Sequence, residues 1–95
     1  MITLGIETSC DETGVAVIRD GKILSNEVAS SLRFHKRYGG IVPEIATRYH
    51  VETIDRVFKK AILNAGVKKS QIGLIAFTYG PGLAGSLLVG VSFAK

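Results

Sequence analysis

Apolar residues in the first thirty positions fall into runs of strand length, separated by short polar stretches. Ile2–Ile6 and Gly14–Ile18 are two such runs, and apolar runs of this length are typical of β-strands. Asp20-Gly21 follows the second run, and this dipeptide best supplies the positive φ angles of a two-residue hairpin turn. A third run, 23–29, lies beyond the turn. The pattern predicts three antiparallel strands at the start of the chain.

The spacing of apolar residues changes to three and four positions between Ile45 and Ala65. This rhythm is typical of a helix with one buried stripe. Pro43 suits the first helical position because its missing N–H would be unpaired there anyway. Glu44 stabilises the same end by opposing the helix dipole. Gly66 is placed to end the helix, so we expect a helix over 43–65.

A continuous apolar run, Ile72–Phe77, follows the helix and predicts a strand that is covered on both faces. Because a helix separates this strand from the earlier ones, we expect it to pair with one of them in parallel. A second helix is predicted over Leu83–Ala94. It reaches Lys95 without a capping glycine or a proline, which indicates a chain interrupted within a helix.

Composition restricts the class of protein. A chain of 95 residues with 46% hydrophobic and 21% charged residues fits one globular domain. The single cysteine, Cys10, excludes a disulfide-stapled secreted scaffold. Leu83–Ala94 is much shorter than the roughly 20 apolar residues of a membrane span. Because the start has no basic segment before an apolar one, we expect no signal peptide, no membrane association and a cytoplasmic location.

Charge is distributed unevenly along the chain, whose net charge is +4. Residues 1–31 carry five acidic and two basic side chains, whereas residues 32–95 carry ten basic and three acidic ones. The basic part would attract a polyanion such as RNA, although many ordinary small domains are equally basic.

The loop 7–13 between the first two predicted strands holds the most informative chemistry. Backbone N–H groups in such a turn can cradle phosphate oxygens, and the Ser9 and Thr13 hydroxyls can donate to them. The alternative is a polar hairpin loop that happens to be acidic. Glu7, Asp11 and Glu12 would repel an unshielded anion, so a phosphate site needs a cation or carboxylates that point away.

Other chemical groups give weaker signals. The acidic neighbours of Cys10 disfavour its thiolate, so catalysis by the thiol is not expected. His35 and His50 have no zinc-binding spacing, and we expect no metal site within this chain. The segment 33–38 mixes cations with aromatic residues and could contact RNA or simply be a solvated loop. The turn 80–83 lies where an α/β sheet places ligands, but it could equally be structural.

Three motifs, in order along the chain, carry a resemblance to a known family. They are 5–13 (GIETSCDET), 35–50 (HKRYGGIVPEIATRYH) and 80–90 (GPGLAGSLLVG). Together they resemble the N-terminal part of the bacterial and mitochondrial type of tRNA threonylcarbamoyladenosine transferase, the TsaD family, and the resemblance runs from Met1 to Lys95 without a gap. Residues 9–12 favour the bacterial form.

The resemblance implies an actin-like ATPase fold built from two ribonuclease H-like lobes. This chain would be the start of the first lobe, residues 1–95, without the second. The family transfers a threonylcarbamoyl group from its adenylate to N6 of the adenosine beside the anticodon, in tRNAs that read codons starting with A. The isolated segment is expected to be inactive. The alternatives are a catalytically silent scaffold of the same fold that binds a partner and, less favoured, a small-molecule kinase.

The resemblance also implies site residues, a cofactor and partners. Asp11 and Glu12 would face the reactive end of the cleft. The substrate-binding residues would be Ser9, Cys10 and Thr13, and the tRNA contacts would be Arg33, Lys36, Arg37, Arg48 and His50. An iron or zinc ion is expected in the complete enzyme, with its histidine ligands after Lys95. The implied partners are tRNA, the paralogous subunit TsaB, bound through helix 44–65 and the helix from Leu83, and an accessory ATPase. A lone fragment is expected to form a homodimer through the same surface.

Overall fold

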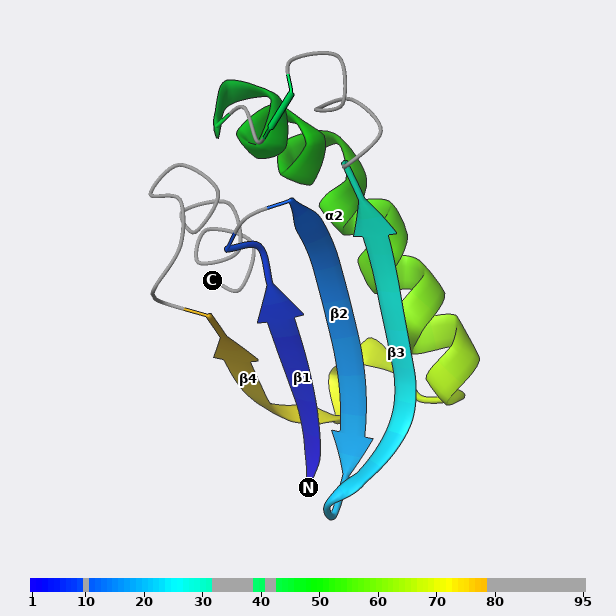
Figure 1. Ribbon diagram of the computed structural model, residues 1–95. Helices are drawn as coiled ribbons and strands as arrows, with labels where there is room; N and C mark the ends of the chain where they lie inside the picture. Colours follow the sequence, from blue (N-terminus) through cyan, green and yellow to red (C-terminus); the bar gives the residue numbers. More distant parts are fainter. Residues whose placement is uncertain (10, 32–38, 41–42, 79–95) are drawn as a thin grey trace.

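The computed structural model describes residues 1–9, 11–31, 39–40 and 43–78. These residues form one sheet, one long helix and a short 3-10 turn (Figure 1). The elements, in chain order, are β1 (Ile2–Glu7), β2 (Glu12–Arg19), β3 (Lys22–Ser30), α2 (Pro43–Ala65), η2 (Lys69–Gln71) and β4 (Ile72–Phe77). The sheet has the strand order β3-β2-β1-β4, with β1 antiparallel to β2 and parallel to β4.

The predicted antiparallel start is confirmed, including its turn. Asp20 and Gly21 join β2 to β3 with φ angles of 48° and 83°, and positive φ at both positions matches the right-handed twist of the flanking strands. Arg19 then pairs with Lys22. The register shifts beyond Ile18, which pairs with Ile23, because Leu24 is an extra residue on β3.

Helix α2 packs on one face of the sheet, against β2 and β3 (Figure 1). Its bounds match the predicted helix, and Gly66 follows it with a φ of 70°. The helix buries side chains at intervals of three and four residues: Ala46, His50, Thr53, Ile54, Val57, Phe58 and Ala61. The sheet contributes the other half of the core through Ile2, Leu4, Ile6, Val15 and Val17. Because β-strand side chains alternate between faces, the residues between these five lie on the sheet face away from α2.

Strand β4 is parallel to β1, as predicted, but its expected burial on both faces is not found among the described residues. Leu74, Ile75 and Phe77 are 52%, 40% and 37% exposed. The reason is topological: β4 is one edge strand of the sheet, whereas α2 packs on β2 and β3, toward the opposite edge. The predicted helix Leu83–Ala94 lies outside the described residues. In the part of the chain that is described, no helix is long and apolar enough to cross a membrane.

Candidate functional site

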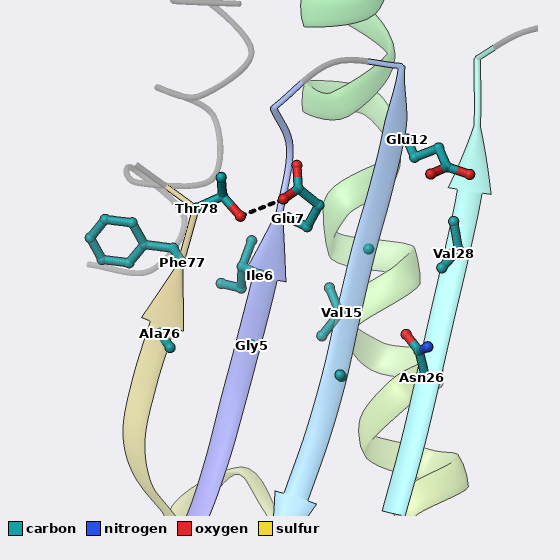
Figure 2. Close-up of a pocket in the computed structure, with 12 residues that line it drawn as sticks. Gly5, Ile6, Glu7, Glu12, Val15, Asn26, Val28, Ala76, Phe77 and Thr78 are labelled. Carbon is teal, nitrogen blue, oxygen red and sulfur yellow. Dashed lines mark hydrogen bonds between the residues drawn. The ribbon is translucent and has the colours of Figure 1, made fainter. Parts of the chain in front are cut away.

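The sheet face away from α2 has a hollow whose floor consists of the smallest side chains. Gly5 pairs with Ala16 on one side and with Ala76 on the other, and Gly14 pairs with Glu7. A Cβ atom added at Gly5 would meet nothing within 4 Å. These positions, with their neighbours, leave a cavity of about 460 Å³ (Figure 2). Polar side chains of Glu7, Glu12, Asn26 and Thr78 line it.

Glu7 is the last residue of β1 and joins two loops at one end of the hollow. Its Oε1 accepts a hydrogen bond of 2.5 Å from the backbone N–H of Ser9, and its Oε2 accepts one from the Thr78 hydroxyl. Figure 2 shows Glu7 and Thr78 pointing toward each other from the ends of β1 and β4. The Thr78 N–H also donates to the Ile6 carbonyl at 3.0 Å. Each carboxylate oxygen of Glu7 thus fixes a different loop, and both loops leave the carboxyl ends of parallel strands, where α/β sheets bind ligands.

The environment of Glu7 favours its charged form. Burial alone would raise the pKa of this carboxyl, but hydrogen bonds from the Ser9 and Thr78 side chains and the Ser9 backbone outweigh it. The charge of nearby His50 acts in the same direction, so the pKa lies below its usual value of 4.5. A carboxylate that is already satisfied in this way serves to hold the loops rather than to accept a proton near neutral pH.

A pH-dependent contribution to stability follows from Glu7. Because its pKa is lower in the folded state, its contribution is present above pH 4.5 and is lost as the pH falls through the lower folded value. We therefore expect the free energy of unfolding of the wild type to exceed that of Glu7→Gln near neutral pH. The difference should shrink in acid. Urea denaturation at a series of pH values measures this difference. Thr78→Val, which removes one hydrogen-bond donor to Glu7, should also lower the free energy of unfolding near neutral pH, but by a smaller amount. Parallel pH curves for the wild type and Glu7→Gln would contradict this assignment.

The loop between β1 and β2 is anchored at two further points. The Asp11 carbonyl accepts hydrogen bonds of 2.8 Å and 2.9 Å from the backbone N–H and the hydroxyl of buried Ser31. The Thr13 hydroxyl lies 2.6 Å from Nδ1 of His50 on α2. With the Glu7 contacts, the loop is held by β4, by the end of β3 and by α2. These hydrogen bonds hold Ser9 and Asp11 on either side of position 10, and a site that must position reacting groups requires such fixed points.

The predicted loop residues divide into two groups. Glu12 is exposed and lines the hollow, while Ser9 and Asp11 are half-buried. Thr13, expected to shape a substrate site, is fully buried and faces α2. We correct that prediction, because a side chain with no exposed surface cannot contact a substrate directly. Cys10 lies outside the described residues.

The predicted tRNA contacts are not brought together among the described residues. Arg48 is exposed on α2, whereas His50 is 0% exposed and belongs to the core. The contact predicted for His50 is corrected for the same reason as that of Thr13. Arg33, Lys36 and Arg37 lie outside the described residues.

Sequence reasoning left Glu7 and Thr78 out of the site residues. Both stand at the carboxyl end of a predicted strand, and the rule that ligands bind at such ends could have identified them together. No group of three potential metal-ligating side chains occurs within the described ranges.

Comparison with known proteins identifies relatives over the whole chain. A family model described as tRNA N6-adenosine threonylcarbamoyltransferase matches residues 22–95. The chain is 62% identical over 95 residues to the protein of that name from Thermosipho africanus. It is 57% identical over 96 aligned residues to the one from Bacillus subtilis. Each match covers 100% of this chain but only 29% and 28% of the respective relatives.

A solved structure supports the fold. YeaZ from Pseudomonas aeruginosa superposes with a TM-score of 0.72 over 99% of this chain and 38% of that chain, at 19% sequence identity. At that identity the likeness concerns the fold alone. The mixed sheet with its helix is part of an actin-like, ribonuclease H-like α/β lobe, as the family resemblance implied.

Proposed function

The chain belongs to the tRNA N6-adenosine threonylcarbamoyltransferase family, and on that premise we propose that it is the N-terminal portion of an enzyme that modifies tRNA. The complete enzyme transfers a threonylcarbamoyl group from threonylcarbamoyl-adenylate to N6 of the adenosine beside the anticodon. Residues 1–95 form the start of its first actin-like lobe. Because this chain spans less than a third of its curated relatives, we do not expect the segment to be active alone.

The anchored loop between β1 and β2 is the observation that carries this proposal. Glu12, where β2 begins, lines the hollow beside the carboxyl ends of β1 and β4, and Asp11 directly precedes it in the loop. Two hydrogen bonds hold the loop backbone: the Ser9 N–H donates to Glu7, and the Ser31 hydroxyl donates to the Asp11 carbonyl. Two carboxylates next to these hydrogen-bonded positions suit a reaction in which a weakly nucleophilic amine must be positioned and must lose a proton.

The transfer step then has defined roles for these residues. N6 of adenosine attacks the carbonyl carbon of the threonylcarbamoyl group and forms an N–C bond, while the bond from that carbon to the phosphate oxygen breaks. The electron pair leaves with AMP. The proton lost from N6 passes to the Asp11 carboxylate, the proposed general base, and Glu12 helps orient the amine. Ser9 and Cys10, beside them in the loop, are the proposed contacts to the adenylate.

The proposed cofactor and partners lie largely beyond these residues. We expect the complete enzyme to hold an iron or zinc ion, and the described residues do not offer a group of three ligands for it. Helix α2 is the proposed contact for the paralogous subunit TsaB, and an accessory ATPase is the third component. The protein would act in the cytoplasm on tRNA. Self-association of the isolated segment through α2 stays a prediction.

Arg48 offers a test of the tRNA-binding side. It is exposed on α2, and an exposed arginine that contacts one phosphate adds about one unit to the salt dependence of binding. We expect Arg48→Ala in the complete protein to weaken tRNA binding and to reduce the slope of log K against log salt by about 1. Filter binding over a salt series measures this. Lys59→Ala is the matched control, because Lys59 is exposed on the same helix and pairs with Asp55 at 2.7 Å. Equal slopes for both variants and the wild type would exclude a phosphate contact at Arg48.

Reconstitution of the reaction tests the proposed function. The complete protein, its partner subunits, threonylcarbamoyl-adenylate and an unmodified tRNA are incubated, and the nucleosides are analysed by mass spectrometry. We expect threonylcarbamoyladenosine to form only when the complete protein is present. A silent scaffold of the same fold is the alternative, because YeaZ shares the architecture. It predicts no product from the complete protein with any combination of partners.

A further inference from the structure

Three buried polar side chains form a connected group between the start of β2 and the middle of α2. Thr13 and His50 are 0% exposed and Thr53 is 7% exposed. The Thr13 Oγ1 lies 2.6 Å from His50 Nδ1 and 3.2 Å from Thr53 Oγ1. Thr53 Oγ1 in turn lies 2.6 Å from the Tyr49 carbonyl oxygen, one helical turn earlier. Buried polar atoms at these distances must share their hydrogens consistently, since each unsatisfied one is costly.

The number of hydrogens in this group fixes the direction of every bond. A carbonyl oxygen can only accept, so the single hydroxyl hydrogen of Thr53 goes to Tyr49. The contact between the two hydroxyls then requires Thr13 to donate to Thr53. Thr13 has no second hydrogen, so it must accept from His50, and His50 Nδ1 must carry a proton.

The opposite arrangement leaves a bond without a hydrogen. If Thr13 donated to an unprotonated Nδ1, its lone pairs would face those of Thr53 at 3.2 Å with no hydrogen between them. Thr53 could supply that hydrogen only by leaving its bond of 2.6 Å to Tyr49. The directed chain from His50 to Thr13, Thr53 and Tyr49 is the arrangement in which all of these contacts are hydrogen bonds.

We propose that His50 is a positioning residue for the loop between β1 and β2, acting through an Nδ1–H donated to Thr13. This role rests on the proposed function of that loop. Thr13 follows Asp11 and Glu12 directly, so the bond from His50 fixes the place where the loop enters β2 and sets its orientation relative to α2. Glu7 fixes the other end of the same loop through Ser9.

The protonation of the His50 ring nitrogens is the direct test of the chain of bonds. The complete protein is labelled with nitrogen-15 in histidine, and the His50 signals are identified by their loss in His50→Asn. We expect Nδ1 to show the chemical shift and one-bond proton coupling of a protonated nitrogen. An unprotonated Nδ1 in the folded protein would overturn the proposal. This measurement uses no catalytic assay, so its result stands whether or not the loop carries the proposed activity.

Paired variants test the positioning role. Thr13→Val removes the hydroxyl and leaves the Nδ1–H of His50 without its acceptor, whereas Thr13→Ser keeps it. We expect Thr13→Val to lower the kcat of transfer roughly 10- to 100-fold with little change in KM, because a displaced loop misplaces reacting groups. Thr13→Ser should stay within a few-fold of the wild type. His50→Asn, whose side-chain amide N–H can take the place of the Nδ1–H, should retain more activity than His50→Leu.

Two outcomes separate this proposal from the function on which it rests. If Asp11→Ala keeps full activity, the proposed role of the loop is wrong, and the state of Nδ1 still decides the direction of the hydrogen bonds. If Asp11→Ala is inactive but folded Thr13→Val has the kcat of the wild type, the positioning role of His50 is wrong. Should Thr13→Val not fold, comparison of His50→Asn with His50→Leu decides, and equal kcat values for that pair would overturn the proposal.

Discussion

Replacing Asp11 with alanine in the complete protein is expected to lower the kcat of threonylcarbamoyl transfer about 10²- to 10⁴-fold, the range over which a positioned general base accelerates a reaction. The loop carrying Asp11 is held through its own backbone by Ser31. The substitution therefore removes the carboxylate without removing the anchor of the loop, and the folded structure should be retained.

Asp20→Ala is the matched control for this prediction. Asp20 is also an acidic residue next to β2, but it lies at the opposite end of that strand, in the turn to β3, where it pairs with the N-terminal ammonium group at 3.0 Å. Its replacement should leave kcat unchanged. Single-turnover kinetics with saturating tRNA and adenylate separate the chemical step from binding. Equal rates for Asp11→Ala and the wild type would remove Asp11 from the reaction.

Phe58→Ala should have the largest effect on stability. Phe58 is 9% exposed and belongs to the core between α2 and the sheet. Truncation of a buried phenylalanine costs about 3–5 kcal/mol, from lost burial and the cavity left behind. Native domains are stable by only about 5–15 kcal/mol, so we expect a large fall in the denaturant midpoint. Leu63→Ala is the control on the same helix, since Leu63 is 79% exposed. It should change the free energy of unfolding by less than about 0.5 kcal/mol. Comparable losses for both variants would contradict the packing of α2.

Local signals in the sequence were sufficient for the helix and the hairpin of β2 and β3. Pro43 and Gly66 mark the ends of α2, and Asp20-Gly21 specifies the turn, because the conformational preferences of these residues act within a few positions. The structure confirms all three. The apolar run predicted strand β4 correctly but not its exposure. The exposure of a strand depends on which elements cover that edge of the sheet, and the apolar run does not specify them.

The site was harder to predict because polar residue type was taken as a sign of function. Thr13 alternates with Val15 and Val17, and His50 lies four residues after Ala46 and four before Ile54, so both belong to buried stripes. Periodicity could therefore have placed both in the core. The bond between Glu7 and Thr78 joins residues 71 positions apart. It depends on the register of β1 against β4, which no local pattern specifies.

The nucleosides of tRNA from cells that lack the gene provide the most direct test of the central claim, that this chain is the loop-bearing N-terminal part of a threonylcarbamoyl transferase. The complete wild-type protein should restore threonylcarbamoyladenosine beside the anticodon, Asp20→Ala should restore it equally, and Asp11→Ala should leave unmodified adenosine. Full modification in the cells that carry only Asp11→Ala, or in cells that lack the gene altogether, would contradict the account.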